Sequence, residues 1–238
     1  MNPVLMIAYN NLALTQKAIE GVLAQDIPVD LYFVDNGSTD DTWSWAETQP
    51  FAAMYRKPRN ESPLKIANEM CAYLFERSEY ILGVPNDVRL PANCYSQLLR
   101  WPRGFVCASD NGQNEPEVRE AHAVSENTPM AVMLTRKWAY DALIARDGYF
   151  FDTGFFHYAS DCDMALRMAS CGIRGVQLDV PYWHYGSASH RLAPQAEGDA
   201  MRRQADVDRA YFVRKYGFRV DSLEYGQRAS DLNFGVKQ

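Results

Sequence analysis

The sequence predicts an α/β protein with a parallel sheet, because strand and helix patterns alternate from its first residues. Val4 to Ala8 and Leu31 to Val34 are short runs, rich in β-branched or aromatic residues, that end in turn residues. Between them lies LALTQKAIEGVLAQ, whose apolar residues recur at helical spacing. A strand, a helix and a strand in this order form a β-α-β unit with a right-handed crossover. In sheets of this kind, ligands bind beyond the carboxyl ends of the strands.

The later segments continue this alternation. A helix is predicted from about Pro63 to Arg77, and the strand YILGV follows it. Phe105 to Ala108 is predicted to be a strand, MAVMLTRKWAYDALIA a strand leading into a helix, and GIRGVQLDVPYWHYG a short strand that carries His184. The acid-rich stretch from Asp110 to Thr128 has no clear periodicity and is long enough to be a functional loop. A charged amphipathic helix is predicted from about Gln195 to Lys215.

Length and composition favour one soluble domain with modest additions. The chain has 238 residues, 47% of them hydrophobic, which is enough to bury a substantial core. No apolar segment approaches the roughly 20 residues that span a bilayer, and the N-terminus has no basic start or cleavage site, so a cytoplasmic location is expected. Five cysteines without a CxxC pair are expected to be reduced, mostly buried thiols. A net charge of −6 gives no general attraction to polyphosphate.

Polar residues gather where predicted strands end. AYNN follows the first strand, DNGSTDDT the second, and PNDV the strand after the long helix. The chain thus supplies carboxylates at Asp35, Asp87 and either Asp161 or Asp163, and an imidazole at His184. Taken singly, these residues have structural explanations: Asp35 as the start of an Asx-turn, His184 as a half-buried histidine, and an aspartate of YASDCDMALRM as a helix cap.

In order and spacing, these motifs resemble the family 2 inverting glycosyltransferases, which have the nucleotide-diphospho-sugar transferase (GT-A) fold. The opening LMIAYNNLALTQKAIEGVLAQDIPVDLYFVDNGSTDDT is similar to the strand, helix and acidic turn of that family, and NESPLKIAN to its next segment. VPNDV resembles the D-x-D turn, and FDTGFFHYASDCDMALRM resembles F-D-E-x-F-F followed by E-D-x-D-L-x-L-R. HYG and RKYG resemble H-x-G and K-W-G, so the likeness extends to about Gly217.

The resemblance implies a Rossmann-like, three-layer α/β/α sandwich with a mixed, mainly parallel central sheet. It further implies a single GT-A domain over residues 1–217, with a nucleotide-sugar-binding part at 1–109 and an acceptor and catalytic part at 110–192. Residues 193–238 are expected to form a C-terminal helical extension packed on this domain.

The resemblance also implies roles for particular residues. Asp161 is the expected general base that takes the proton of an acceptor hydroxyl, while Asp163 caps or braces the helix start. Asp87 and His184 are the expected metal ligands, for Mn²⁺ in preference to Mg²⁺ because an imidazole is a softer ligand than oxygen. The expected donor is a UDP- or dTDP-sugar, with a UDP-sugar favoured, because Asp35 can accept from a pyrimidine N3–H, which suits uracil or thymine better than a purine. The residues expected to contact the nucleotide are Ala8, Tyr9, Asn10, Asp35, Ser38, Asn60, Asn68 and Asn86.

Two departures from the family pattern keep other functions open. Pro85 stands where the family has the first acid of D-x-D, and Ser160 stands where it has the glutamate of E-D. Both substitutions would suit a catalytically silent nucleotide-sugar-binding module. A sugar nucleotidyltransferase is less favoured because AYNNLAL lacks the glycine-rich, basic loop that holds a triphosphate. The expected acceptor is a hydroxyl of a glycan, lipid-linked sugar, protein or small molecule, with a modified nucleic acid base not excluded; the oligomeric state is not predicted.

Overall fold

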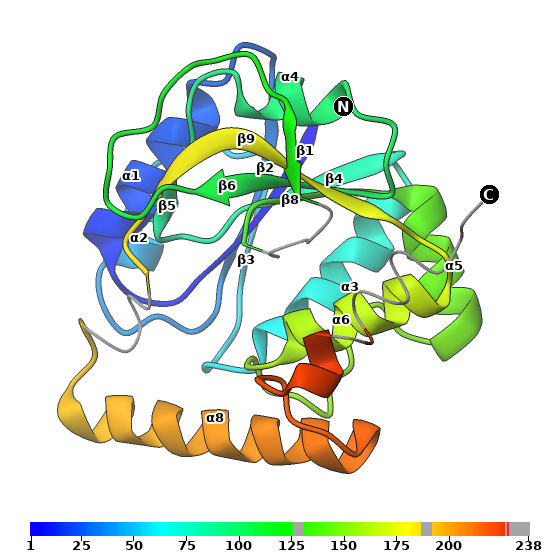
Figure 1. Cartoon of the computed structure of the whole chain (residues 1–238). Coiled ribbons are helices and arrows are strands. Elements are labelled where there is room, and N and C mark those ends of the chain that lie inside the picture. The colour runs from blue at the N-terminus through cyan, green and yellow to red at the C-terminus, as the bar shows by residue number, and fades with distance from the viewer. Residues whose placement is uncertain (126–130, 187–191, 227, 229–238) are drawn as a thin grey trace.

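A central mixed sheet with helices on both faces forms the body of the protein (Figure 1). The structure is a computed structural model and describes residues 1–125, 131–186, 192–226 and 228. The predicted three-layer α/β/α class is confirmed. No helix in these described ranges is both long and apolar enough to cross a bilayer.

Among the described residues the sheet has nine strands, and it is parallel in its N-terminal half. Its order is β3 (Ala53–Arg56), β2 (Asp30–Asp35), β1 (Pro3–Ala8), β4 (Tyr80–Gly83), β8 (Met133–Arg136), β6 (Phe105–Asp110), β9 (Gly175–His184) and β5 (Val88–Arg89), with β7 (Ala123–Ser125) also paired to β9. β8 runs antiparallel to both β4 and β6, which makes the sheet mixed. In the parallel pair of β1 and β2, Ala8 lies opposite Asp35, so the two polar turns after these strands meet at one edge.

The two faces of β1 belong to different cores, as the alternation of side chains along a strand requires. The helices in the described ranges include α1 (Leu12–Leu23), α2 (Thr42–Ala46), α3 (Pro63–Phe75), α4 (Cys94–Leu99), α5 (Lys137–Asp147), α6 (Ser160–Ser170) and α8 (Gln195–Tyr216). Val4 and Met6 pack with α1 and α4, whereas Leu5 packs with α3, α5 and α6. α8 lies below this body in Figure 1 and packs through Phe212 on a third cluster that includes Leu64 of α3.

Several predicted boundaries change. The helix predicted to reach Arg77 ends at Phe75, and the short strand predicted to carry His184 is the ten-residue β9. The stretch predicted as a functional loop from residue 110 contains β7, and its residues 126–128 lie outside the described ranges. All five cysteines are free in the structure, and Cys71, Cys94 and Cys107 are buried.

One glycine fixes the turn after β2. Gly37 has a φ of +76°, a conformation that favours glycine, and a Cβ there would collide with the backbone of Arg59. The turn after β2 therefore lies directly against the segment that leads to Asn60.

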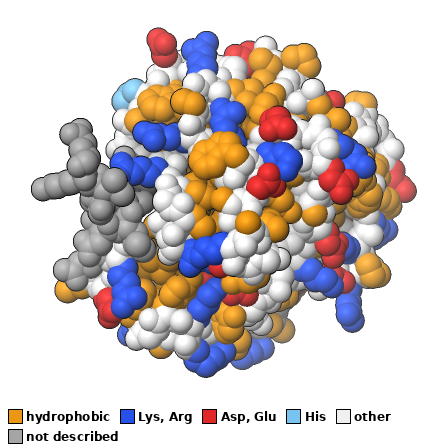
Figure 2. All heavy atoms as spheres, turned by 90° about the vertical axis from the view of Figure 1, so that its right-hand side faces the viewer, with side chains coloured by type: hydrophobic (Ala, Val, Ile, Leu, Met, Phe, Trp, Pro, Cys, Tyr) orange, Lys and Arg blue, Asp and Glu red, His pale blue; other side chains and the backbone are white. Residues whose placement is uncertain are grey.

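Surface charge agrees with the composition. On the face shown in Figure 2, acidic and basic side chains are interspersed with apolar ones. This face therefore offers no continuous basic surface for a polyphosphate chain.

Candidate functional site

A cavity of about 690 Å³ opens at the carboxyl ends of β1 and β4. Its walls also include the starts of α3 and α6, the end of β9, and Met201 and Gln204 of α8. Seven of the predicted site residues line it: Ala8, Tyr9, Asn60, Asn86, Asp87, Asp161 and His184. Four others, Asn10, Asp35, Ser38 and Asn68, lie outside its lining. The strand-end rule thus brings together residues from widely separated segments, as the parallel topology requires.

The side chains of Asn10 and Ser38 hold the turn after β1. Because both bond to the backbone of neighbouring turns, they do not face the cavity. Asn10 and Asn11 both have positive φ values, 55° and 62°, which reverse the chain between β1 and α1. The N–H of Asn10 donates to Ser38 Oγ at 2.8 Å, and the Asn10 side-chain oxygen accepts from the N–H of Thr39 at 2.8 Å. Asn10 and Ser38 thus join the two strand-end turns and support Tyr9, which reaches the cavity wall.

Tyr9 is half-buried beneath the start of α8. Burial raises the pKa of its phenol, and the nearby carboxylate of Glu197 raises it further. The ring is thus a neutral aromatic surface in the cavity, close to the residues that follow β1.

Asp35 is completely buried, and the side chain of Arg56 covers it. Its Oδ1 accepts from the N–H of Ser38 at 3.2 Å. Its Oδ2 lies 3.2 Å from Arg56 Nε, yet accepts no well-aligned hydrogen bond from any group in the described part of the chain. The Arg56 guanidinium also lies over the ring of Trp43. A base can therefore donate to Asp35 only if Arg56 moves aside.

Asn68, which was predicted to contact the nucleotide, is hydrogen-bonded within the protein at both ends of its amide. Its Nδ2 donates to the carbonyl of Phe151 at 2.8 Å, and its Oδ1 accepts from the N–H of Phe151 at 2.7 Å. Both ends of the amide are thus used to fix Phe151, which lines the cavity. By contrast, Asn60 and Asn86 do line the cavity; Asn86 Nδ2 donates to Thr15 Oγ1 at 3.0 Å, which orients its amide.

Asp87 and His184 come together because β5 pairs with the end of β9. His184 Nε2 lies 3.5 Å from Asp87 Oδ2, and His184 Nδ1 lies 2.6 Å from Asp110 Oδ2. The hydrogen bond to Asp87 raises the pKa of His184, burial opposes this, and Asp110 adds to it, so that the pKa is about 9. The imidazole is thus held between two carboxylates at the cavity wall.

This pair fits a divalent cation in part. One carboxylate oxygen and one imidazole nitrogen at this separation can both reach one ion, and Mn²⁺ accepts both donor types. The described residues contain no cluster of three or more His, Cys, Asp or Glu arranged to hold a metal. These two groups alone would leave the other coordination positions of such an ion to a ligand or to water.

Asp110 is a site residue that the sequence interpretation missed. Its Oδ1 accepts from the N–H of Gly112 at 2.7 Å, which aims Oδ2 at His184. The predicted strand ended at Ala108, whereas β6 continues to Asp110. Had the strand been extended by two residues, the same strand-end rule would have identified Asp110.

The two aspartates at the start of α6 have different surroundings. Asp161 is exposed, lines the cavity, and accepts from the N–H of Cys162 at 2.8 Å. Asp163 is buried and accepts from Arg167 Nε at 2.8 Å, Lys215 Nζ at 2.6 Å and the Tyr216 hydroxyl at 2.8 Å. Among the described residues no side chain caps α6 at Ala159, so Asp163 braces the helix and does not cap it. Asp161 alone is placed to act on a ligand.

The two departures from the family pattern also have defined positions. Ser160 Oγ donates to the carbonyl of His157 at 2.6 Å, which ties the first residue of α6 to the preceding loop. Pro85 lines the cavity beside Asn86 and Asp87. Neither substitution blocks access of Asp161 or Asp87 to the cavity.

Comparison with known proteins gives the fold and a family match to part of the chain. A family model described as glycosyl transferase family 2 matches residues 4–103. No curated protein sequence matches significantly. Among solved structures, S. aureus TarS 1-349 is 18% identical with a TM-score of 0.57, and the alignment covers 96% of this chain and 77% of TarS 1-349.

Two further structures have the same architecture. The mannosyltransferase PcManGT from Pyrobaculum calidifontis, in complex with GDP-Man and Mn²⁺, is 16% identical with a TM-score of 0.56, covering 99% of this chain and 87% of that one. GalNAc-T7 with UDP, GalNAc and Mn²⁺ is 9% identical with a TM-score of 0.60, covering 98% of this chain and 54% of that one. At identities this low, the structural likeness establishes the fold alone, which is that of GT-A glycosyltransferases.

Proposed function

We propose that this chain, whose residues 4–103 match the glycosyl transferase family 2 model, transfers a sugar from a nucleotide diphosphate sugar to a hydroxyl with inversion at the anomeric carbon. One observation carries the proposal. Tyr9, Asp87, Asp161 and His184, from four separate segments, line one cavity at the carboxyl ends of the strands. A silent binding module would not need an exposed carboxylate at Asp161 directed into this cavity.

In the proposed reaction, Asp161 acts as the general base. The acceptor oxygen forms a bond to the anomeric carbon while the bond from that carbon to the diphosphate oxygen breaks. The acceptor proton passes to the Asp161 carboxylate, and the nucleotide diphosphate leaves from the opposite face. Because only one carboxylate is required, burial of Asp163 in a structural network is consistent with this mechanism.

Asp87 and His184 would hold a divalent cation, with Mn²⁺ the first choice. When bound, the cation neutralises the negative charge that develops on the departing diphosphate. Both PcManGT and GalNAc-T7 were solved with Mn²⁺. The role of the chain's own residues is to fix two ligands at the cavity wall and to leave the other positions to the donor.

A uridine nucleotide is the favoured donor. TarS has been solved with UDP and with UDP-GlcNAc, whereas PcManGT was solved with GDP-Man. In this chain, Tyr9 offers an aromatic face for a base. Asp35 Oδ2, which lacks a well-aligned donor among the described residues, would accept a pyrimidine N3–H once Arg56 is displaced.

UDP with Mn²⁺ is expected to stabilise the wild-type protein, and Asp87→Ala is expected to remove the metal-dependent part. At a ligand concentration about 100 times Kd, binding contributes about 2.7 kcal/mol, which raises Tm by about 5 °C or more for a chain of this size. The measurement is thermal unfolding with UDP alone, Mn²⁺ alone and both. Asp206→Ala, an exposed acid on α8, is the matched control. Equal shifts for wild type and Asp87→Ala would remove Asp87 as a ligand.

Asp110→Asn is expected to weaken Mn²⁺ binding without abolishing it. Loss of the negative charge beside His184 Nδ1 weakens the hydrogen bond that orients the ring, and changes of this kind typically cost about 10- to 100-fold in metal affinity. Mn²⁺ titration in the presence of UDP, followed by electron paramagnetic resonance, measures this. Asp141→Asn on α5, half-exposed beside Lys137, should leave the affinity unchanged. An unaltered affinity in Asp110→Asn would show that Asp110 does not orient the ligand.

A further inference from the structure

A buried carboxylate on α8 is surrounded by backbone donors from another segment. Asp208 has no exposed surface. Its Oδ1 accepts from the N–H of Phe156 at 3.0 Å, and its Oδ2 accepts from the N–H groups of His157 at 2.9 Å and Tyr158 at 2.8 Å. Gln204 Nε2, one turn earlier on α8, also donates to Oδ1 at 2.9 Å. Four donors thus compensate the cost of burying this charge.

The segment that Asp208 holds leads directly to the proposed base. Residues 156–161 all line the cavity. After Tyr158 the chain turns at Ala159, whose φ is 58°, and enters α6, which carries Asp161 in its first turn. The position of Asp161 therefore depends on where the backbone of residues 156–158 is fixed.

The same segment is fastened on its other side by α3. Ser62 Oγ, at the N-cap of α3, donates to the carbonyl of Phe156 at 2.6 Å. The residue Phe156 is thus bonded through its N–H to Asp208 and through its carbonyl to Ser62. The loop before Asp161 lies clamped between two helices that are far apart in the sequence.

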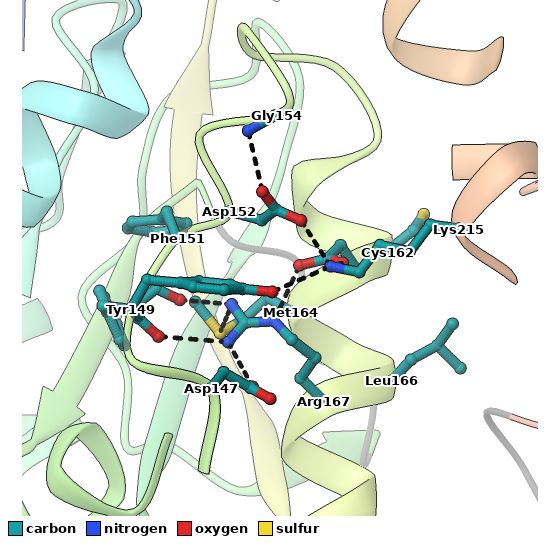
Figure 3. Close-up of polar contacts among 12 residues, drawn as sticks. Asp147, Tyr149, Phe151, Asp152, Gly154, Cys162, Met164, Leu166, Arg167 and Lys215 are labelled. Atoms are coloured by element: carbon teal, nitrogen blue, oxygen red, sulfur yellow. Dashed lines mark hydrogen bonds and ion pairs between the residues drawn. The ribbon is translucent and has the colours of Figure 1, made fainter. Parts of the chain in front are cut away.

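α8 is itself fixed against the base-bearing helix. Lys215 Nζ donates to Asp163 of α6 and to Asp152, each at 2.6 Å. Figure 3 shows Lys215 pointing toward Asp152. One turn before Lys215, the ring of Tyr211 lies so close to Gly154 that a Cβ on Gly154 would collide with it. Asp208 is therefore presented by a helix that is anchored at independent points.

We propose that Asp208 is a positioning residue, which fixes the backbone of residues 156–158 and thereby aligns Asp161 with the acceptor hydroxyl. The inference rests on the proposed function, because it assigns Asp161 the role of base. Displacement of a catalytic group by about 1 Å can cost about 100-fold in rate, whereas substrate binding need not change. A purely structural role for Asp208 would instead lower stability and affect binding and turnover together.

Asp208→Asn tests the proposal by replacing one carboxylate oxygen with an NH₂ group of nearly the same size. The new NH₂ group faces at least one backbone N–H and cannot accept from it, so amide hydrogen exchange at residues 156–158 should accelerate by about 10-fold or more. We expect kcat for Mn²⁺-dependent UDP release from UDP-GlcNAc and other UDP-sugars to fall about 10- to 100-fold. KM for the donor and the Tm shift with UDP and Mn²⁺ should stay close to wild type. Asp206→Asn, exposed on the same helix, is the control and should change none of these.

A double variant separates positioning from structural support. In an Asp161→Asn background, Asp208→Asn should cause no further loss of turnover, because the group that it positions is already absent. Ser62→Ala, which removes the second fastening of Phe156, should also lower kcat with KM unchanged. The Ser62→Ala variant keeps the proposal testable if Asp208→Asn folds poorly.

The possible results distinguish the inference from the function on which it rests. If exchange accelerates but kcat does not fall, or if Asp208→Asn adds a further loss to Asp161→Asn, the positioning role is wrong. Parallel loss of nucleotide binding, stability and turnover would also overturn it. If the wild type releases no UDP from any UDP-sugar and does not bind UDP, it is the proposed function that fails.

Discussion

Asp161→Asn is expected to lower Mn²⁺-dependent UDP release from a UDP-sugar by about 10²- to 10⁴-fold, the range that removal of a general base typically costs. The asparagine side chain cannot take a proton from the attacking water or hydroxyl. Its carbonyl oxygen can still accept from the N–H of Cys162, so the start of α6 should keep its geometry. We therefore expect the Tm, and its shift with UDP and Mn²⁺, to stay close to wild type. Turnover and thermal unfolding measured on the same preparations check both expectations.

The control for this variant is another exposed acid that does not line the cavity. Asp206→Asn makes the same chemical change on the surface of α8 and should retain wild-type turnover. If Asp161→Asn turns over as fast as Asp206→Asn, Asp161 is not the base. Wild-type binding of UDP with no turnover on any donor and acceptor would instead favour the silent binding module.

The positions of the polar strand ends could be predicted from the sequence because they follow from topology. Parallel strands bring their carboxyl ends to one edge, so Tyr9 after β1 and Asp87 after β4 were expected to be neighbours, and both line the cavity. His184 was placed with them by the family resemblance. The pairing of Val88 with His184 in the antiparallel β5–β9 ladder provides the physical reason.

Side-chain roles that depend on distant partners could not be predicted. Asn68 lies in α3 with no local feature that distinguishes a ligand contact from its two hydrogen bonds to Phe151, which is 83 residues away. Asp208 is one of several acids in a charged helix, and only the packing of α8 on residues 156–158 shows that it is buried. Asp35 was expected to meet a base, but the sequence gives no sign that Arg56 covers it.

The order of the strands in the sheet also could not be predicted from the periodicity of the sequence. The insertion of β8 antiparallel between β4 and β6 determines which residues face the cavity from the second half of the sheet. Periodicity identifies a strand but not its neighbours, because the alternation of side chains is the same in either direction. The mixed character of the sheet was therefore expected only from the resemblance.

Arg167 and Lys215 belong to one ionic network, in which Arg167 pairs with Asp147 and Asp163, and Lys215 pairs with Asp152 and Asp163 (Figure 3). Arg167, 3% exposed, donates to Asp163 at 2.8 Å, to Asp147 at 3.0 Å and to the carbonyl of Phe150. Burial disfavours the charged form of Lys215, but its hydrogen bonds to Asp152 and Asp163 outweigh this and raise its pKa. The network thus joins α6, the loop after α5 and α8.

Arg167→Met is expected to destabilise the protein by about 3–5 kcal/mol, the usual cost of removing one partner of a buried ion pair. Methionine fills part of the volume but leaves the carbonyl of Phe150 and one side of Asp163 without their donor. For a chain of this size, that loss corresponds to a decrease in Tm of about 6–20 °C, measured by thermal unfolding.

The matched control is Arg202→Met on α8, where the arginine is 60% exposed and pairs with Asp199. A surface ion pair of this kind contributes about 1 kcal/mol or less, so its loss should hardly change Tm. Equal effects of the two substitutions would mean that the Arg167 network does not hold α6 and α8 together. Because Lys215 and Tyr216 of α8 also bond Asp163, a large effect of Arg167→Met should be accompanied by faster amide exchange in the first turn of α6, where Asp161 lies.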